Sequence, residues 1–136
     1  MKSKLPYILI ALENEVDRDA LVREVGRHIC YAAVEPVENK GQLMSVLEDC
    51  SWSDYPAMVI LNNNNDGVPA KEIVDQILSK PCFSDIKIVI VNEPGISDPT
   101  VYPAAVQVLQ KPTGVFELED VVSKIDKVLI EELEMC

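Results

Sequence analysis

The sequence is short of positive charge, of paired cysteines and of long apolar runs. Its 12 lysines and arginines face 23 acidic residues, giving a net charge of −11, so we expect no nucleic acid or membrane partner. No apolar run reaches membrane-spanning length and no signal peptide is expected, which predicts a cytoplasmic location. The cysteines stand singly, without metal-ligand spacing, which favours free thiols over disulfides or a metal. They are Cys30, Cys50, Cys82 and Cys136.

Five segments have the apolar character of β-strands. Two of them, residues 7–12 and 58–61, are continuous apolar runs, as is typical of parallel strands that are buried on both faces. The second segment contains Pro36, which cannot donate a hydrogen bond to a neighbouring strand and therefore indicates a sheet edge. The predicted strands cover residues 7–12, 31–37, 58–61, 86–91 and 106–109.

Apolar residues at helical spacing predict helices between these strands. The first helix covers about residues 17–28, with Gly26 as its predicted stop. Asn39 is placed to cap the second helix and Pro69 to open the third. Residues 93–105 contain three prolines and a glycine, so the fourth helix is predicted to be short or unwound. The last helix is marked by Leu118, Val121, Val122, Ile125, Val128 and Leu129.

This alternation of strands and helices predicts an α/β fold. The expected architecture is a doubly wound, five-stranded parallel sheet with strand order 2-1-3-4-5 and helices on both faces. We expect one domain over residues 1–136, with a core at about residues 6–130. In such sheets, ligands and chemistry collect at the carboxyl ends of strands one and three.

The tetrad Asn62–Asn65 directly follows the third predicted strand, residues 58–61. It therefore places an amide at the strand end where reactive side chains are commonly found. The amide of Asn62 can donate and accept hydrogen bonds, but it cannot act as a carboxylate nucleophile. We interpret Asn63–Asn65 as turn formers, since asparagine tolerates left-handed backbone and bonds to its own chain.

Four stretches, taken in order, resemble the receiver domains of bacterial two-component response regulators, which have a CheY-like, flavodoxin-like fold. The resemblance covers about residues 6–130. The lysine-proline pair after the fifth strand is its most specific element. The stretches are Ile8–Asn14 with Arg18 and Leu21 downstream, Pro56–Gly67, Ile88–Asn92 and Lys111-Pro112.

The resemblance assigns roles to five positions. In receivers, two acids after strand one help to hold Mg²⁺, an aspartate ending strand three accepts the phosphoryl group, and a hydroxyl and a lysine contact its oxygens. This chain has Glu13 and Asn14, Asn62, Asn92 and Lys111 at these positions, so Lys111 alone is unchanged. Mg²⁺ needs anionic oxygen ligands, and Glu13 by itself is only a weak candidate for a metal ligand. We expect no Mg²⁺, no other cofactor and no aspartyl phosphorylation.

Two further features each allow two interpretations. Lys111 either joins a hydrogen-bonded cluster that holds the crevice in one state, or faces solvent beside Pro112. Ile96, Val101 and Tyr102 either form a partner surface or belong to a packed loop without a partner.

The predicted function is that of a stand-alone pseudo-receiver, which is not an enzyme. It would signal through phosphorylation-independent contact with another protein, such as a kinase, a phosphatase or a motility or clock component, as a monomer or weak dimer. One alternative is an atypical phosphorelay receiver that still responds to a phosphodonor. Another is a nucleotide- or flavin-binding module on the same fold, although Glu13, Glu15 and Asp17 would repel a phosphate after strand one.

Overall fold

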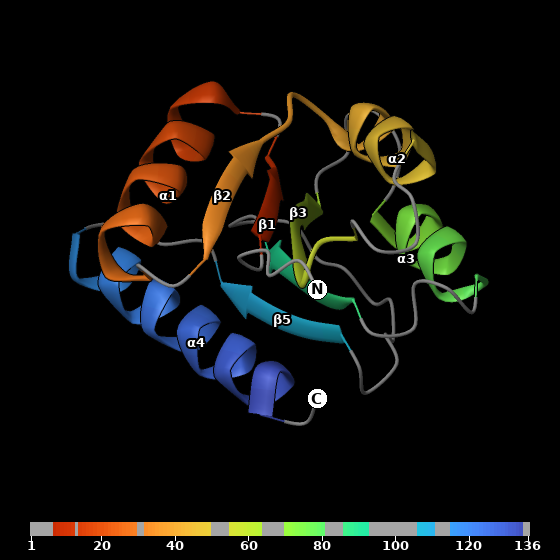
Figure 1. Ribbon diagram of the computed structural model, residues 1–136. Helices are drawn as coiled ribbons and strands as arrows, with labels where there is room; N and C mark the ends of the chain where they lie inside the picture. Colours follow the sequence, from red (N-terminus) through yellow and green to blue (C-terminus); the bar gives the residue numbers. More distant parts are fainter. Residues whose placement is uncertain are drawn as a thin grey trace.

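The computed structural model describes residues 7–12, 14–29, 32–49, 55–63, 70–80, 86–92, 106–110 and 115–134. Within these ranges, strands and helices follow one another along the chain (Figure 1). The elements are β1 (Tyr7–Ala11), α1 (Glu15–His28), β2 (Ala33–Pro36), α2 (Lys40–Asp49), β3 (Met58–Asn63), α3 (Ala70–Leu78), β4 (Lys87–Asn92), β5 (Val106–Gln110) and α4 (Val115–Glu134).

The five strands form one parallel sheet in the order β2-β1-β3-β4-β5. This confirms the predicted fold class and strand order. In the middle of the sheet, Leu9 of β1 lies opposite Val59 of β3, and Val59 lies opposite Ile88 of β4. All three side chains are buried, as the continuous apolar runs predict for strands covered on both faces.

The helices cover the two faces of the sheet in pairs. In Figure 1, α1 and α4 lie on one face, while α2 and α3 lie on the other. Successive side chains of β3 alternate between these layers. Met58 and Ile60 belong to the core beneath α1 and α4, and Val59 and Leu61 belong to the core beneath α2 and α3.

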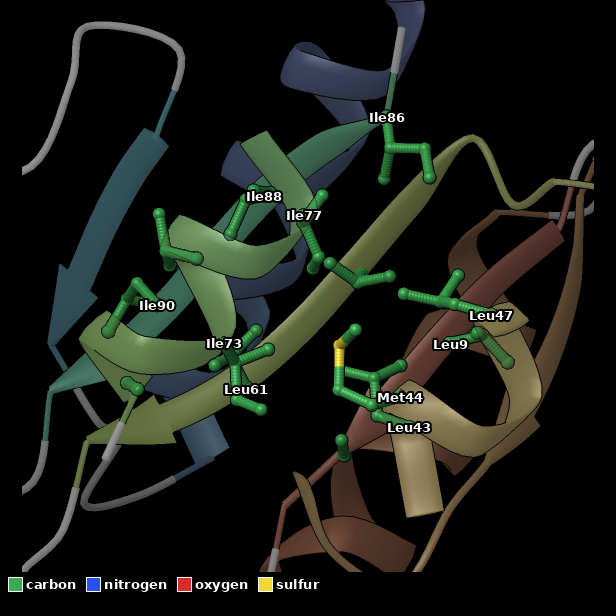
Figure 2. Packing of buried hydrophobic residues seen from close by; sticks show 14 of the residues in the cluster. Leu9, Leu43, Met44, Leu47, Leu61, Ile73, Ile77, Ile86, Ile88 and Ile90 are labelled. Carbon is green, nitrogen blue, oxygen red and sulfur yellow. The ribbon is translucent and has the colours of Figure 1, made fainter. Parts of the chain in front are cut away.

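The core beneath α2 and α3 is shown in Figure 2. Ile73 and Ile77 of α3 pack over the sheet near Leu61, Ile88 and Ile90, and α2 contributes its own side chains beside Leu9. Burying a side chain of this size contributes about 1.5–3 kcal/mol. The side chains from α2 are Leu43, Met44 and Leu47.

The start of α1 differs from the prediction, whereas its predicted end at residue 28 is confirmed. The helix begins at Glu15, earlier than expected. Gly26 is not its stop, because the helix continues to His28 and the Ile29 N–H donates to the Val25 carbonyl oxygen at 2.8 Å. A glycine inside a helix is disfavoured by only about 1 kcal/mol relative to alanine. Packing of the buried Leu21 and Val25 offsets that preference.

The start of α2 matches the prediction. The Oδ1 atom of Asn39 accepts a hydrogen bond from the Gln42 N–H at 2.8 Å. The Gln42 Oε1 atom in turn accepts one from the Glu38 N–H at 2.6 Å, so two backbone donors at the helix start are satisfied. Just before this cap, β2 ends at Pro36 on the edge of the sheet, as that proline indicates.

Two predictions on the helices lie outside the described residues. These are the opening of α3 by Pro69 and the short or unwound fourth helix within residues 93–105. None of the helices in the described ranges combines the length and the apolar character that crossing a membrane requires.

Candidate functional site

The strand order reverses between β1 and β3, and this fixes the position of the candidate site. From β1 the chain crosses through α1 to β2, whereas from β3 it crosses through α3 to β4 on the other side. The two crossover helices therefore diverge at the carboxyl ends of β1 and β3, which is where open α/β sheets bind ligands. Ala11 and Leu61 are the last registered pair of these strands, so Leu12 and Asn62 lead into the crevice.

Asn62 is inside β3 rather than after it. The strand continues to Asn63, and Asn62 lies opposite Val91 of β4. The Asn62 side chain is 2% exposed, and it is the one buried polar residue among those the structure describes. Strand alternation places it on the same side of the sheet as Met58 and Ile60, facing the layer of α1 and α4.

Asn63 contradicts its interpretation as a turn former, because it is the last residue of β3 and lies opposite Asn92. Pairing with β4 satisfies its backbone groups in the ladder, which outweighs the weak strand propensity of asparagine. Asn64 and Asn65 lie outside the described residues.

Asn92 ends β4 and continues a row of amide residues across the sheet. It lies opposite Asn63 on one side and opposite Gln110 of β5 on the other. The register thus places Asn92 beside Asn63, and it places Asn62 beside Val91. Gln110 was not singled out from the sequence, although the alignment of the three strand ends was the signal that could have identified it.

Asn14 serves as the N-cap of α1. Its backbone is extended, with φ −78° and ψ 118°, and its Oδ1 atom accepts a hydrogen bond from the Asp17 N–H at 3.1 Å. Its carbonyl oxygen accepts a further bond from the Arg18 N–H at 2.9 Å. Asparagine is among the strongest N-cap residues, and the acidic Glu15 and Asp17 in the first turn suit the helix dipole. The side-chain oxygen at this predicted site position therefore has a structural role.

Arg18 bonds to the backbone beyond the carboxyl ends of β1 and β2, which the sequence did not indicate. Its Nη1 atom donates to the Leu12 carbonyl oxygen at 3.1 Å and to the Glu38 carbonyl oxygen at 3.4 Å. The first of these bonds is partly buried. One side chain of α1 thus contacts the backbone that follows β1 and the backbone that follows β2.

The described residues do not fit a Mg²⁺ site. Asn14, Asn62 and Asn92 are neutral amides, whereas Mg²⁺ is usually bound through one or two carboxylates. The Oδ1 atom of Asn14 already accepts a hydrogen bond. Among the residues that the structure describes, no group of three or more histidines, cysteines or acids is placed to hold a metal ion.

The other predicted site residues lie outside the described ranges. Glu13, Lys111 and the proposed partner surface are in this group, so their roles stay predictions. That surface consists of Ile96, Val101 and Tyr102.

Solved structures of receiver domains match this architecture. The Mn²⁺-bound form of the response regulator Rcp1 has a TM-score of 0.70 at 19% identity, over 90% of this chain and 92% of the other. The chain has the receiver fold. The phosphorylated cyanobacterial phytochrome response regulator RcpA matches with a TM-score of 0.72 at 14% identity, over 93% of this chain and 95% of the other. The receiver domain of a histidine kinase from Syntrophus aciditrophicus matches with a TM-score of 0.73 at 14% identity, over 93% of this chain and 91% of the other.

These neighbours are signalling modules rather than enzymes. No protein-family model matches the chain, and no curated protein matches it. The likeness at 14–19% identity is therefore a likeness of fold.

Proposed function

We propose that this chain is a receiver-like domain of two-component or phosphorelay signalling that acts by protein–protein contact without phosphotransfer, that is, a pseudo-receiver. The sheet order and the receiver domains of similar structure support the signalling part of this proposal. The amides at the crevice support the absence of phosphotransfer.

The observation that carries the proposal is the buried amide of Asn62 at the carboxyl end of the central strand. An amide oxygen is not an anionic nucleophile, so Asn62 cannot form the acyl phosphate that an aspartate forms. Its 2% exposure also leaves little room for an incoming phosphodonor. Asn14, at the other described acid position, caps a helix. Neither residue supplies the negative charge that would hold a metal ion against a phosphoryl group.

The partner that we propose is another signalling protein: a kinase, a phosphatase or a component of a motility or clock system. Receiver domains of similar structure come from response regulators and from histidine kinases. The net charge of −11 disfavours nucleic acid as the partner. We place the docking surface at Ile96, Val101 and Tyr102, and we expect a cytoplasmic monomer or weak dimer.

The test uses amide NMR of the uniformly ¹⁵N-labelled protein. Mg²⁺ with beryllofluoride mimics a phosphorylated receiver, and we expect no widespread shift when both are added. Separate additions of Mg²⁺ and of fluoride provide the controls, and a receiver that keeps its aspartate shows that the reagent is active.

Mass spectrometry after incubation with acetyl phosphate gives an independent readout. We expect no phosphoryl adduct. Widespread NMR shifts with beryllofluoride, or an adduct that maps to the crevice, would instead support the atypical phosphorelay receiver. The alternative of a flavin-binding module predicts a coloured protein. The visible absorbance of the purified chain tests this alternative.

A further inference from the structure

Arg18 connects two backbone segments that are far apart in the sequence. Its Nη1 atom donates to the carbonyl oxygens of Leu12 and Glu38, which are 6 and 20 residues away. By comparison, the side chains of Asn14 and Asn39 that cap α1 and α2 each bond to a residue three positions away. The caps therefore order single helix ends, whereas Arg18 joins two separate strand–helix junctions.

The first of these junctions lies beside Asn62. The last registered pair of β1 and β3 is Ala11 with Leu61, so the next residues, Leu12 and Asn62, continue into the crevice together. Both side chains are buried. A donor that holds the Leu12 carbonyl group therefore fixes the backbone that borders the Asn62 amide.

The second junction leads from β2 into α2. Its backbone is also tied to β1, because the Val37 N–H donates to the Ile10 carbonyl oxygen at 2.9 Å. The Arg18 bond to the Glu38 carbonyl oxygen, at 3.4 Å, lies one residue further on. The carboxyl end of β1 and the exposed β2–α2 junction are thus held by the guanidinium of one half-buried residue.

The chemistry of the guanidinium suits this role. It is always charged, it carries five N–H donors in a planar arrangement, and it cannot titrate in the physiological range. Hydrogen bonds from such a donor are about twice as strong as neutral ones. The contacts therefore persist at any physiological pH and need no metal ion or phosphoryl group.

We propose that Arg18 is the positioning residue that holds the crevice in one arrangement by joining the carboxyl end of β1 to the β2–α2 junction. The inference rests on the proposed function and deepens it. In a domain that receives no phosphoryl group, an internal contact of this kind can fix the backbone beside Asn62 without a ligand.

The experiment compares Arg18→Gln with Arg27→Gln. Arg27 is on the same helix, and the substitution removes the same charge. However, its Nη1 atom pairs locally with Glu24 at 3.1 Å on a side chain that is 69% exposed. In ¹⁵N NMR spectra, we expect Arg18→Gln to shift the backbone amides of Leu12 and Glu38 and the side-chain amide of Asn62. Arg27→Gln should change only resonances near the end of α1.

Hydrogen exchange adds a readout that a global loss of stability would not reproduce. We expect the Val37 amide to exchange about tenfold faster in Arg18→Gln than in Arg27→Gln, while core amides of β3 exchange alike in the two variants. Arg18→Lys keeps the charge without the planar set of donors and should give an intermediate rate. Equal exchange at Val37 and an unmoved Asn62 side-chain amide in Arg18→Gln would overturn the proposal.

A further measurement on the wild-type protein covers the case in which Arg18→Gln does not fold. The Nη protons of Arg18 should exchange with water more slowly than those of Arg27, because they are held by two carbonyl groups. Equal exchange of the two guanidinium groups would contradict the assignment. None of these measurements uses a phosphodonor, so a response to beryllofluoride would remove the proposed function without changing the result for Arg18.

Discussion

Replacing Asn62 by aspartate places a carboxyl group where the structure holds an amide that is 2% exposed. The two side chains have nearly the same shape, so the substitution leaves the packing around β3 unchanged. It replaces an NH₂ donor by an oxygen and introduces a group that can ionise. The resulting change in stability therefore reports the electrostatic environment of the crevice.

The magnitude follows from the burial of this position. Loss of solvent raises the pKa of a buried carboxyl group by up to 3–5 units, and each unit corresponds to about 1.36 kcal/mol. Asn62 is the second-last residue of the central strand β3, close to the carboxyl end of the sheet, so we take about half of that range. Asn62→Asp should then lower the free energy of unfolding by about 2–3 kcal/mol at pH 7.

The sign of the pH dependence is set by the raised pKa. In the unfolded chain, the carboxyl group loses its proton near pH 4, approximately, whereas in the folded chain it holds the proton to higher pH. The destabilisation is therefore absent below the unfolded pKa. It grows as the pH rises and becomes constant above the folded pKa.

Urea denaturation of the variant and the wild type at pH 4 and at pH 7 measures this difference. At each pH, the wild-type free energy of unfolding is subtracted from that of the variant. This subtraction cancels the contribution of the other acidic residues. Asn14→Asp is the matched control: it makes the same chemical change at an exposed N-cap, where aspartate is as favourable as asparagine. If Asn62→Asp were as stable as the wild type at both pH values, the reasoning would be refuted. A nearby cation, for which Lys111 is the candidate, would then have to compensate the carboxylate.

Two further predictions concern other positions of the predicted site. Asn14→Ala removes the acceptor for the Asp17 N–H and should lower the free energy of unfolding by about 1 kcal/mol. Urea denaturation measures this change, and equal stability of Asn14→Ala and the wild type would show that the cap contributes nothing. Lys111→Ala should lower the melting temperature by several degrees, as expected for the loss of about 1 kcal/mol, measured by circular dichroism. An unchanged melting temperature would favour the solvent-facing alternative for this lysine.

The sequence predicted the strands that carry the site more accurately than it predicted the residues at which these strands end. The third and fourth predicted strands stop at Leu61 and Val91, because asparagine is rare in strands. The structure extends both strands, so that Asn62, Asn63 and Asn92 are inside the sheet. Strand pairing supplies hydrogen-bond partners for their backbone groups, and a single-chain pattern does not contain that information.

The same limit applies to the first helix. The sequence contains Asn14 followed three residues later by Asp17, which is a pattern compatible with an N-cap. The resemblance to receivers instead assigned Asn14 to a degraded metal site. The structure shows the capping hydrogen bond, so the local role of this residue is established, while the roles of Glu13 and Lys111 remain predictions from the resemblance.

The doubly wound parallel class was determined by the sequence itself, because buried apolar strands alternate with amphipathic helices and crossovers between parallel strands are right-handed. The order 2-1-3-4-5 is one of the two common orders for such sheets, and strand pairing in the structure selects it. The contacts of Arg18 were decided only by tertiary structure. Leu12 and Glu38 lie 6 and 20 residues away from it, and they come within reach of one guanidinium because β1 and β2 are neighbours in the sheet and α1 packs beside both.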